Sequence, residues 1–125
     1  MDDETAAEQF LDNCQFMTIA VAENGEPWAV PVHIARREGM VFEWDSSTEA
    51  VHSRAIEAHP RVALSMFRLT FGEVKEFGFY AQATAKKLTE IGNGRARYQA
   101  VVDRAWINDE RHVKRKIDVV GSKQA

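Results

Sequence analysis

The chain has almost no cysteine: Cys14 is the only one among 125 residues. A disulfide within the chain is therefore impossible, which excludes a fold that depends on internal disulfides. No apolar run approaches the roughly 20 residues that a membrane-spanning helix needs. The N-terminal stretch MDDETAAEQF also lacks the basic and then apolar segments of a secretory signal. These absences predict a cytoplasmic protein that does not enter a membrane.

Positive charge is not in excess, because 16 Lys and Arg stand against 19 Asp and Glu, for a formal net charge of −3. A nucleic-acid binder usually presents a basic surface, so this function class is disfavoured. One basic run, residues 111–116, is short and is interpreted as a solvated strand face or tail. The four histidines and one cysteine show no metal-ligand spacing, which argues against a structural zinc site.

Proline and glycine are also sparse, with three and seven residues, and they form no linker. Apolar residues make up 45% of the chain and charged residues 28%, as in ordinary globular proteins. No internal repeat or low-complexity tract divides the sequence. A chain of this length fits one compact domain, which we expect to span residues 1–125.

The first half of the chain predicts a helix and three strands. Residues 3–13 place apolar side chains on one helical face, with acids in the first turn. The apolar runs 16–22 and 28–35 read as strands joined by Asn24-Gly25, a strong hairpin signal. Pro31 removes a hydrogen-bond donor, so the second run should be an edge strand or bulged. A turn at 37–39 and a strand at 40–44 would complete a three-stranded meander.

The second half predicts two more helices and three more strands. Ser46 followed three residues later by Glu49 is a capping box, which predicts a helix over 46–58 that ends at His59-Pro60. Strands are expected at 62–67 and 77–88, with Gly78 as a bulge. A helix over 89–106 and a last strand at 112–120 would follow. Five or six antiparallel strands with short helices indicate a mainly β fold, either a small barrel or a Greek-key sheet.

Hydroxyl side chains at the start of a helix can hold a phosphate, because the free N–H groups and the helix dipole both attract anions. Ser46 and Ser47 occupy this position in the predicted 46–58 helix. The alternative is that they only cap the helix, which contributes about 1 kcal/mol. His33 and His52 lie nearby in the sequence, and a protonated imidazole could face the phosphate. Both histidines could equally be ordinary surface or hydrogen-bonded residues.

The order of these features resembles a known family. The matching features are a strand, an Asn-Gly turn, a strand containing Pro31-Val32, the run 39–42 (GMVF), the step 44–47 (WDSS), and a helix ending in the run 59–64 (HPRVAL). A later run with Ala83, Ala85 and Leu88 is similar to the family's Gly-x-Ala-x-x-Leu strand. Together they resemble the FMN-binding split-barrel family typified by pyridoxamine 5′-phosphate oxidase. The resemblance implies a six-stranded antiparallel split barrel with short flanking helices, and a homodimer with FMN at the subunit interface.

The resemblance also implies which residues would hold the cofactor. The phosphate would meet Ser46, Ser47 and His52, and the flavin ring would face the strand residues Val30, Pro31, Val32 and His33. Trp28 and Trp44 could stack on the ring or line the dimer interface, since aromatic side chains serve both roles. Gln82 would face the groove only if the register of its strand points it inward.

Several positions depart from the oxidase pattern. Ala50, Val51 and His52 stand where the oxidase has a serine, an arginine and a lysine. Trp28 replaces a phosphate-binding arginine, and His33 replaces a lysine. The chain thus has fewer cations for a phosphate than the oxidase has.

The predicted function is that of an FMN-binding flavoprotein, an oxidoreductase acting on a small organic substrate. In such enzymes the cofactor supplies the redox chemistry, so no catalytic side chain is named. The alternative is a non-catalytic module that binds a flavin, a deazaflavin or haem, or that only mediates a dimeric interaction.

Overall fold

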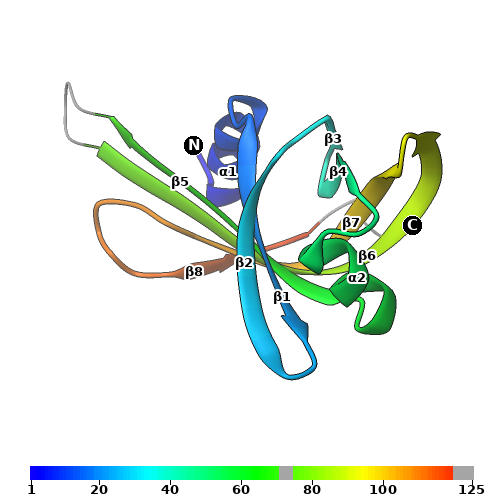
Figure 1. Cartoon of the computed structure of the whole chain (residues 1–125). Coiled ribbons are helices and arrows are strands. Elements are labelled where there is room, and N and C mark those ends of the chain that lie inside the picture. The colour runs from blue at the N-terminus through cyan, green and yellow to red at the C-terminus, as the bar shows by residue number, and fades with distance from the viewer. Residues whose placement is uncertain (71–74, 120–125) are drawn as a thin grey trace.

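The structure is a computed structural model that describes residues 1–70 and 75–119 (Figure 1). Ten elements follow one another along the chain: α1 Asp3–Asp12, β1 Phe16–Glu23, β2 Glu26–His33, β3 Arg36–Glu38, β4 Val41–Ser47, α2 Val51–Ala58, β5 Arg61–Thr70, β6 Lys75–Gly92, β7 Arg95–Asn108 and β8 Arg115–Ile117. The described part of the chain contains no helix with the length and apolar content needed to cross a membrane.

All strands join one antiparallel sheet in the order β2-β1-β5-β6-β7-β4-β3, with β8 added beside β7. The sheet curls until its two ends approach each other. At this point the peptide N–H of Ile34 donates to the Gln15 carbonyl, and that of Ala35 donates to the Glu43 carbonyl, both at 2.8 Å. The connection between β2 and β3 thereby bridges the two ends of the sheet. The predicted mainly β split barrel is confirmed, with eight strands where six were expected.

The β1–β2 hairpin forms as its turn residues predict. Asn24 and Gly25 both have positive φ, 52° and 80°. A two-residue hairpin turn requires this because its twist must match that of the flanking strands. Helix α1 begins at an Asp2 cap that accepts a hydrogen bond from the Thr5 N–H, and it buries Phe10 and Leu11 against the sheet. Helix α2 ends at Ala58, before His59-Pro60, as predicted.

The predicted helix over 89–106 is wrong. These residues complete β6 and form β7, which pairs with both β6 and β4. The turn between them contains Asn93 and Gly94, with φ of 58° and 72°. This is the same hairpin signal as Asn24-Gly25, and it prevailed over the helical spacing of the apolar residues.

Three smaller predictions also need correction. The meander is wrong, because β2 and β4 do not pair and residues 36–38 form β3, which pairs with β4. The last strand is three residues long, β8, and the end of the predicted 112–120 run lies outside the described residues. Gly78 pairs regularly and is no bulge. A Cβ there would lie 2.4 Å from the Tyr80 hydroxyl, so glycine makes room for the Tyr80–Asn108 hydrogen bond.

Candidate functional site

Strand β2 is one end of the sheet, so of the two predictions for Pro31, an edge strand or a bulge, the edge strand is confirmed. The hydrogen bond from the Ile34 N–H to the Gln15 carbonyl makes these two residues a hydrogen-bonded pair. Hydrogen-bonded and non-hydrogen-bonded pairs alternate along antiparallel strands, so this bond fixes which peptide groups of β2 face β1. By this alternation the peptide groups of Ala29, Pro31 and His33 point away from β1. Proline is tolerated there since no ladder donor is lost.

The two faces of β2 differ. Trp28, Val30 and Val32 share the inner face, and their exposure rises from 8% at Val32 through a half-buried Val30 to 47% at Trp28. The inner face therefore opens gradually toward the hairpin turn. Helix α2 packs against β1 and touches β2 beside this opening. Figure 1 shows β2 crossing the front of the barrel, with α2 next to its lower part.

Ser46 and His52 form a buried pair. Ser46 lies on the inward face of β4, and the His52 Nε2 atom approaches its Oγ atom at 2.9 Å. Both side chains are buried, with exposures of 7% each. The structure therefore brings together two of the predicted phosphate ligands, but their polar atoms meet each other.

The predicted capping box is wrong. Ser46 and Ser47 end β4, where they pair with Ala96 and Arg95 of β7. Helix α2 begins only at Val51, and its N-cap residue, Ala50, has no side chain to cap it. Tertiary pairing overrides the local motif here. Hydrogen bonding with β7 extends β4 through Ser47, past the residue at which the capping box would start a helix.

The turn between β4 and α2 is tied down by its own hydrogen bonds. The Glu49 N–H donates to Ser47 Oγ at 3.1 Å, and both the N–H and the hydroxyl of Thr48 donate to the Gly94 carbonyl. Arg54 on α2 donates to the Glu49 carbonyl and pairs with Glu23 at the end of β1. These groups of the turn are thus engaged within the chain, whereas the buried Ser53 hydroxyl of α2 has no partner among the described residues.

Cations on β4 and its neighbours are also engaged. Arg97 of β7 bonds Asp45 and donates to Glu43 at 2.9 Å, while Arg36 of β3 pairs with the other Glu43 oxygen at 3.2 Å. The hydrogen bond from Arg97 holds the pKa of the Asp45 carboxyl below its usual range. These two arginines neutralise carboxylates of the chain. Arg95, the ladder partner of Ser47, donates to the Asp45 carbonyl and pairs with no carboxylate among the described residues.

Trp44 belongs to the core, which corrects its prediction as a groove residue. It has no exposed surface, and its ring stacks on Tyr98 with centroids 5.9 Å apart and planes 17° from parallel. Strand alternation directs residues 42, 44 and 46 of β4 inward, so Trp44 points into the barrel.

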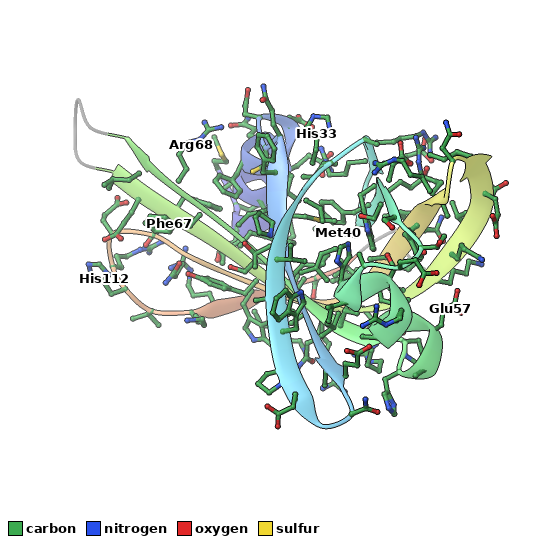
Figure 2. The ribbon with its side chains drawn as sticks, in the orientation of Figure 1. His33, Met40, Glu57, Phe67, Arg68 and His112 are labelled. Atoms are coloured by element: carbon green, nitrogen blue, oxygen red, sulfur yellow. The ribbon has the colours of Figure 1, made fainter. Side chains whose placement is uncertain are left out.

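His33 and Gln82 lie on the outer face of the sheet, away from the Ser46–His52 pair. The His33 ring meets the Phe16 ring edge-on, with centroids 5.4 Å apart. Gln82 borders a hollow of about 500 Å³ whose floor is formed by Ala20, Ala22 and Ala63. Figure 2 labels His33 at the end of β2, and Phe67 and Arg68 on the arm of β5 that extends past α1.

Burial makes His52 a pH-sensitive element of stability. Desolvation lowers the pKa of its imidazole below the ordinary 6.5, so the unfolded chain binds a proton that the folded chain does not. We expect the contribution of His52 to the free energy of unfolding to fall as the pH drops below 6.5, by at most about 1.4 kcal/mol per pH unit. Urea unfolding at a series of pH values measures this. His52→Gln, which can keep the bond to Ser46, should flatten the slope between neutral and mildly acidic pH, and an unchanged slope would contradict the assignment.

Sequence reasoning missed the outer sheet face and the arginine network. The predicted 89–106 helix contains Arg97 and Tyr98, and a helix there does not imply their contacts with β4. The second Asn-Gly pair was the one local signal that could have revealed β7. Within the described residues, no three metal-ligating side chains gather closely enough to hold a metal ion.

Comparison with known proteins gives the chain its relatives. A family model described as pyridoxamine 5′-phosphate oxidase matches residues 3–123. No curated protein sequence matches. Among solved structures, a FAD-binding protein from Mesorhizobium loti has a TM-score of 0.74 at 12% identity, covering 86% of this chain and 93% of its own.

Two further solved structures share the fold. A haem-binding protein from Mycobacterium smegmatis has a TM-score of 0.81 at 13% identity, covering 94% of this chain and 58% of its own. A Clostridium acetobutylicum protein related to general stress protein 26 has a TM-score of 0.74 at 9% identity, covering 98% and 99%. Identities this low show the fold alone. The family model spans nearly the whole chain, and the chain therefore belongs to the pyridoxamine 5′-phosphate oxidase family.

Proposed function

We propose that the chain is a homodimeric flavoprotein, an oxidoreductase that acts on a small organic substrate. The observation that carries the proposal is the open inner face and free edge of β2, uncharged from Pro27 to Val32, in a chain of this family. The FAD-binding protein from Mesorhizobium loti supports it by sharing the fold.

The residues of β2 fit a flavin ring. The free carbonyls of Ala29 and Pro31 can accept hydrogen bonds from the ring's N–H group, and the peptide N–H of His33 can donate one. The half-buried Val30 offers apolar contact on the inner face, next to Val32, which is buried. Of the residues predicted to bind the cofactor, Trp28, Val30, Pro31, Val32 and His33 stay in the proposal. Ser46, Ser47 and His52 would border the ribityl chain.

The outer face of the sheet suits a second copy of the chain. Small side chains on β1 and β5 form the middle of this surface, and Arg61 and Arg104 border the hollow above Ala63. A second hollow of about 280 Å³ lies beside Phe16 and Phe67. Two such faces can pack closely, as the inner faces of paired sheets do. In this dimer Gln82 and His33 lie at the interface and can reach the partner's cofactor.

A bound flavin supplies the electron transfer, and the protein supplies binding, orientation and exclusion of water. No side chain of the groove is assigned as an acid or a base. The cytoplasmic location predicted from the sequence belongs to the same proposal.

A second candidate is non-catalytic binding of a flavin, a deazaflavin or haem. The observation that favours it is the likeness to the haem-binding protein from Mycobacterium smegmatis, which extends over 94% of this chain. Such a binder would hold its ligand without turnover.

The test is reconstitution followed by spectroscopy. The purified protein is incubated with riboflavin, FMN, FAD or haemin, desalted, and examined by visible absorbance and light scattering. We expect retained flavin and a dimeric mass. Val30→Glu should abolish flavin retention by placing a carboxylate in the inner face, whereas Val113→Glu, at an exposed site in the C-terminal loop, should not. Retained haemin without flavin would favour the second candidate, and a monomer that retains no ligand would contradict both.

A further inference from the structure

We propose that the hollow above Ala63, on the outer face of the sheet, binds the carboxylate of a small organic acid, and that Arg104 recognises this group. In the dimer proposed above, the outer face meets the partner subunit, so the acid is the substrate presented to the partner's cofactor. This site rests on the proposed function and gives it a substrate class.

A β-bulge in β7 lies beside the hollow. The register between β6 and β7 shifts at the pair Gln82–Arg104, and Asp103 is left without a partner on β6. Side chains of a regular strand alternate between the two faces, but Asp103 and Arg104 are both exposed, while Val102 and Ala105 on either side are buried. The extra residue therefore turns Arg104 onto the outer face. Bulges are common next to active sites, where they redirect a side chain in this way.

Of the two arginines that border the hollow, one is paired and the other is free. Arg61 donates to both carboxylate oxygens of Asp103, at 2.9 and 3.2 Å, and to Thr84 Oγ1 at 3.0 Å. The hydrogen bonds from Arg61 hold the pKa of the Asp103 carboxyl below its usual range, so Asp103 is ionised and neutralises Arg61. Arg104 forms no ion pair within the described part of the chain. Two guanidinium groups against one carboxylate leave one positive charge at the rim.

The size and lining of the hollow define the ligand. Its volume of about 500 Å³ lies within the range of small-molecule sites. Ala20 and Ala63 are direct partners in the β1–β5 ladder and form a floor of small apolar side chains. Gln82, the ladder partner of Ala63 on β6, adds an amide that can donate and accept hydrogen bonds.

The charge at the rim selects among anions. A guanidinium group can bind a carboxylate through two parallel hydrogen bonds. The single net positive charge matches a carboxylate monoanion, whereas a phosphate monoester carries about −1.5 to −2 charges at neutral pH. The ligand that fits is thus a carboxylic acid with a flat apolar body that can lie on the alanine floor.

The experiment is a calorimetric titration of the purified protein, loaded with the flavin that it retains. The probes are benzoate, its uncharged analogue benzamide, and phenyl phosphate. We expect benzoate to bind more tightly than benzamide by about tenfold or more, and phenyl phosphate to bind no more tightly than benzoate. In NMR spectra of protein with labelled alanine methyl groups, benzoate should shift the resonances of Ala20, Ala22 and Ala63.

Three variants at exposed positions test the assignment. Arg104→Gln should weaken benzoate by about tenfold or more and remove its advantage over benzamide. Ala63→Leu should weaken benzoate and benzamide alike, because it fills the floor without changing the charge. Lys86→Gln is the matched control, since it removes an exposed cation that lines a neighbouring hollow of about 300 Å³ and should leave the affinity unchanged. Circular dichroism confirms that each variant folds.

The outcomes separate this site from the proposed function. If benzamide binds as tightly as benzoate, or if Lys86→Gln weakens benzoate as much as Arg104→Gln does, the carboxylate site is overturned. If the protein retains flavin but does not bind benzoate, the flavoprotein stands and the site falls. If benzoate binds a protein that retains no flavin, the site stands while the proposed oxidoreductase fails.

Discussion

Trp44→Ala is expected to lower the free energy of unfolding by about 3–5 kcal/mol, the range for removing a large aromatic side chain from a core. Trp44 has no exposed surface and stacks on Tyr98, its direct partner in the β4–β7 ladder. Alanine would leave a cavity between two strands whose pairing holds that end of the barrel. Urea unfolding followed by circular dichroism measures the change.

Trp28→Ala is the matched control, because the same side chain is removed from an exposed site. Its cost should stay within about 0.5 kcal/mol. Trp44→Phe should cost much less than Trp44→Ala, since the indole Nε1 has no hydrogen-bond partner among the described residues and the aromatic packing is partly kept. Equal losses for Trp28→Ala and Trp44→Ala would show that Trp44 does not lie in the core.

These two tryptophans also show what could be read from the sequence. Both lie in apolar strands, and the sequence predicts both as groove residues. Local pattern gives a strand but not which of its faces is covered. The structure separates them through β7. Tyr98 covers Trp44, whereas no strand of the described residues pairs with the outer edge of β2, which carries Trp28.

The elements predicted well are those fixed by short-range physics. Helix α1, the hairpin at Asn24-Gly25 and the end of α2 at His59-Pro60 each follow from a few neighbouring residues. The ordered set of such features was also enough to suggest the correct family, since it depends on sequence order rather than on packing.

The failures share a tertiary cause. Ser46 and Glu49 have the spacing of a capping box, yet Ser46 pairs with Ala96 and remains in β4. Residues 89–106 have a spacing compatible with a helix, yet residues 95–108 form β7 between β6 and β4, where strand pairing satisfies their peptide groups on both sides. Because the sequence did not predict β7, it did not predict that Arg97 binds Glu43 and Asp45 of β4.

Arg97→Met is expected to lower the free energy of unfolding by about 2–3 kcal/mol, somewhat less than is typical for breaking a fully buried ion pair. The Glu43 carboxylate is 10% exposed and is shared between Arg97 and Arg36. Methionine keeps the length of the side chain but removes its charge, so Glu43 would retain only the half-exposed Arg36. Urea unfolding of the variant measures the loss.

Two further variants test whether the burial of Glu43 is the cause. Arg36→Met should cost less than about 1 kcal/mol, because the Arg36 side chain is 53% exposed and exposed pairs contribute little. Adding Glu43→Leu to Arg97→Met should recover part of the stability, since no buried carboxylate is then left without its main partner. If the double variant is less stable than Arg97→Met, or if the two arginines cost the same, the loss does not come from an uncompensated charge at Glu43.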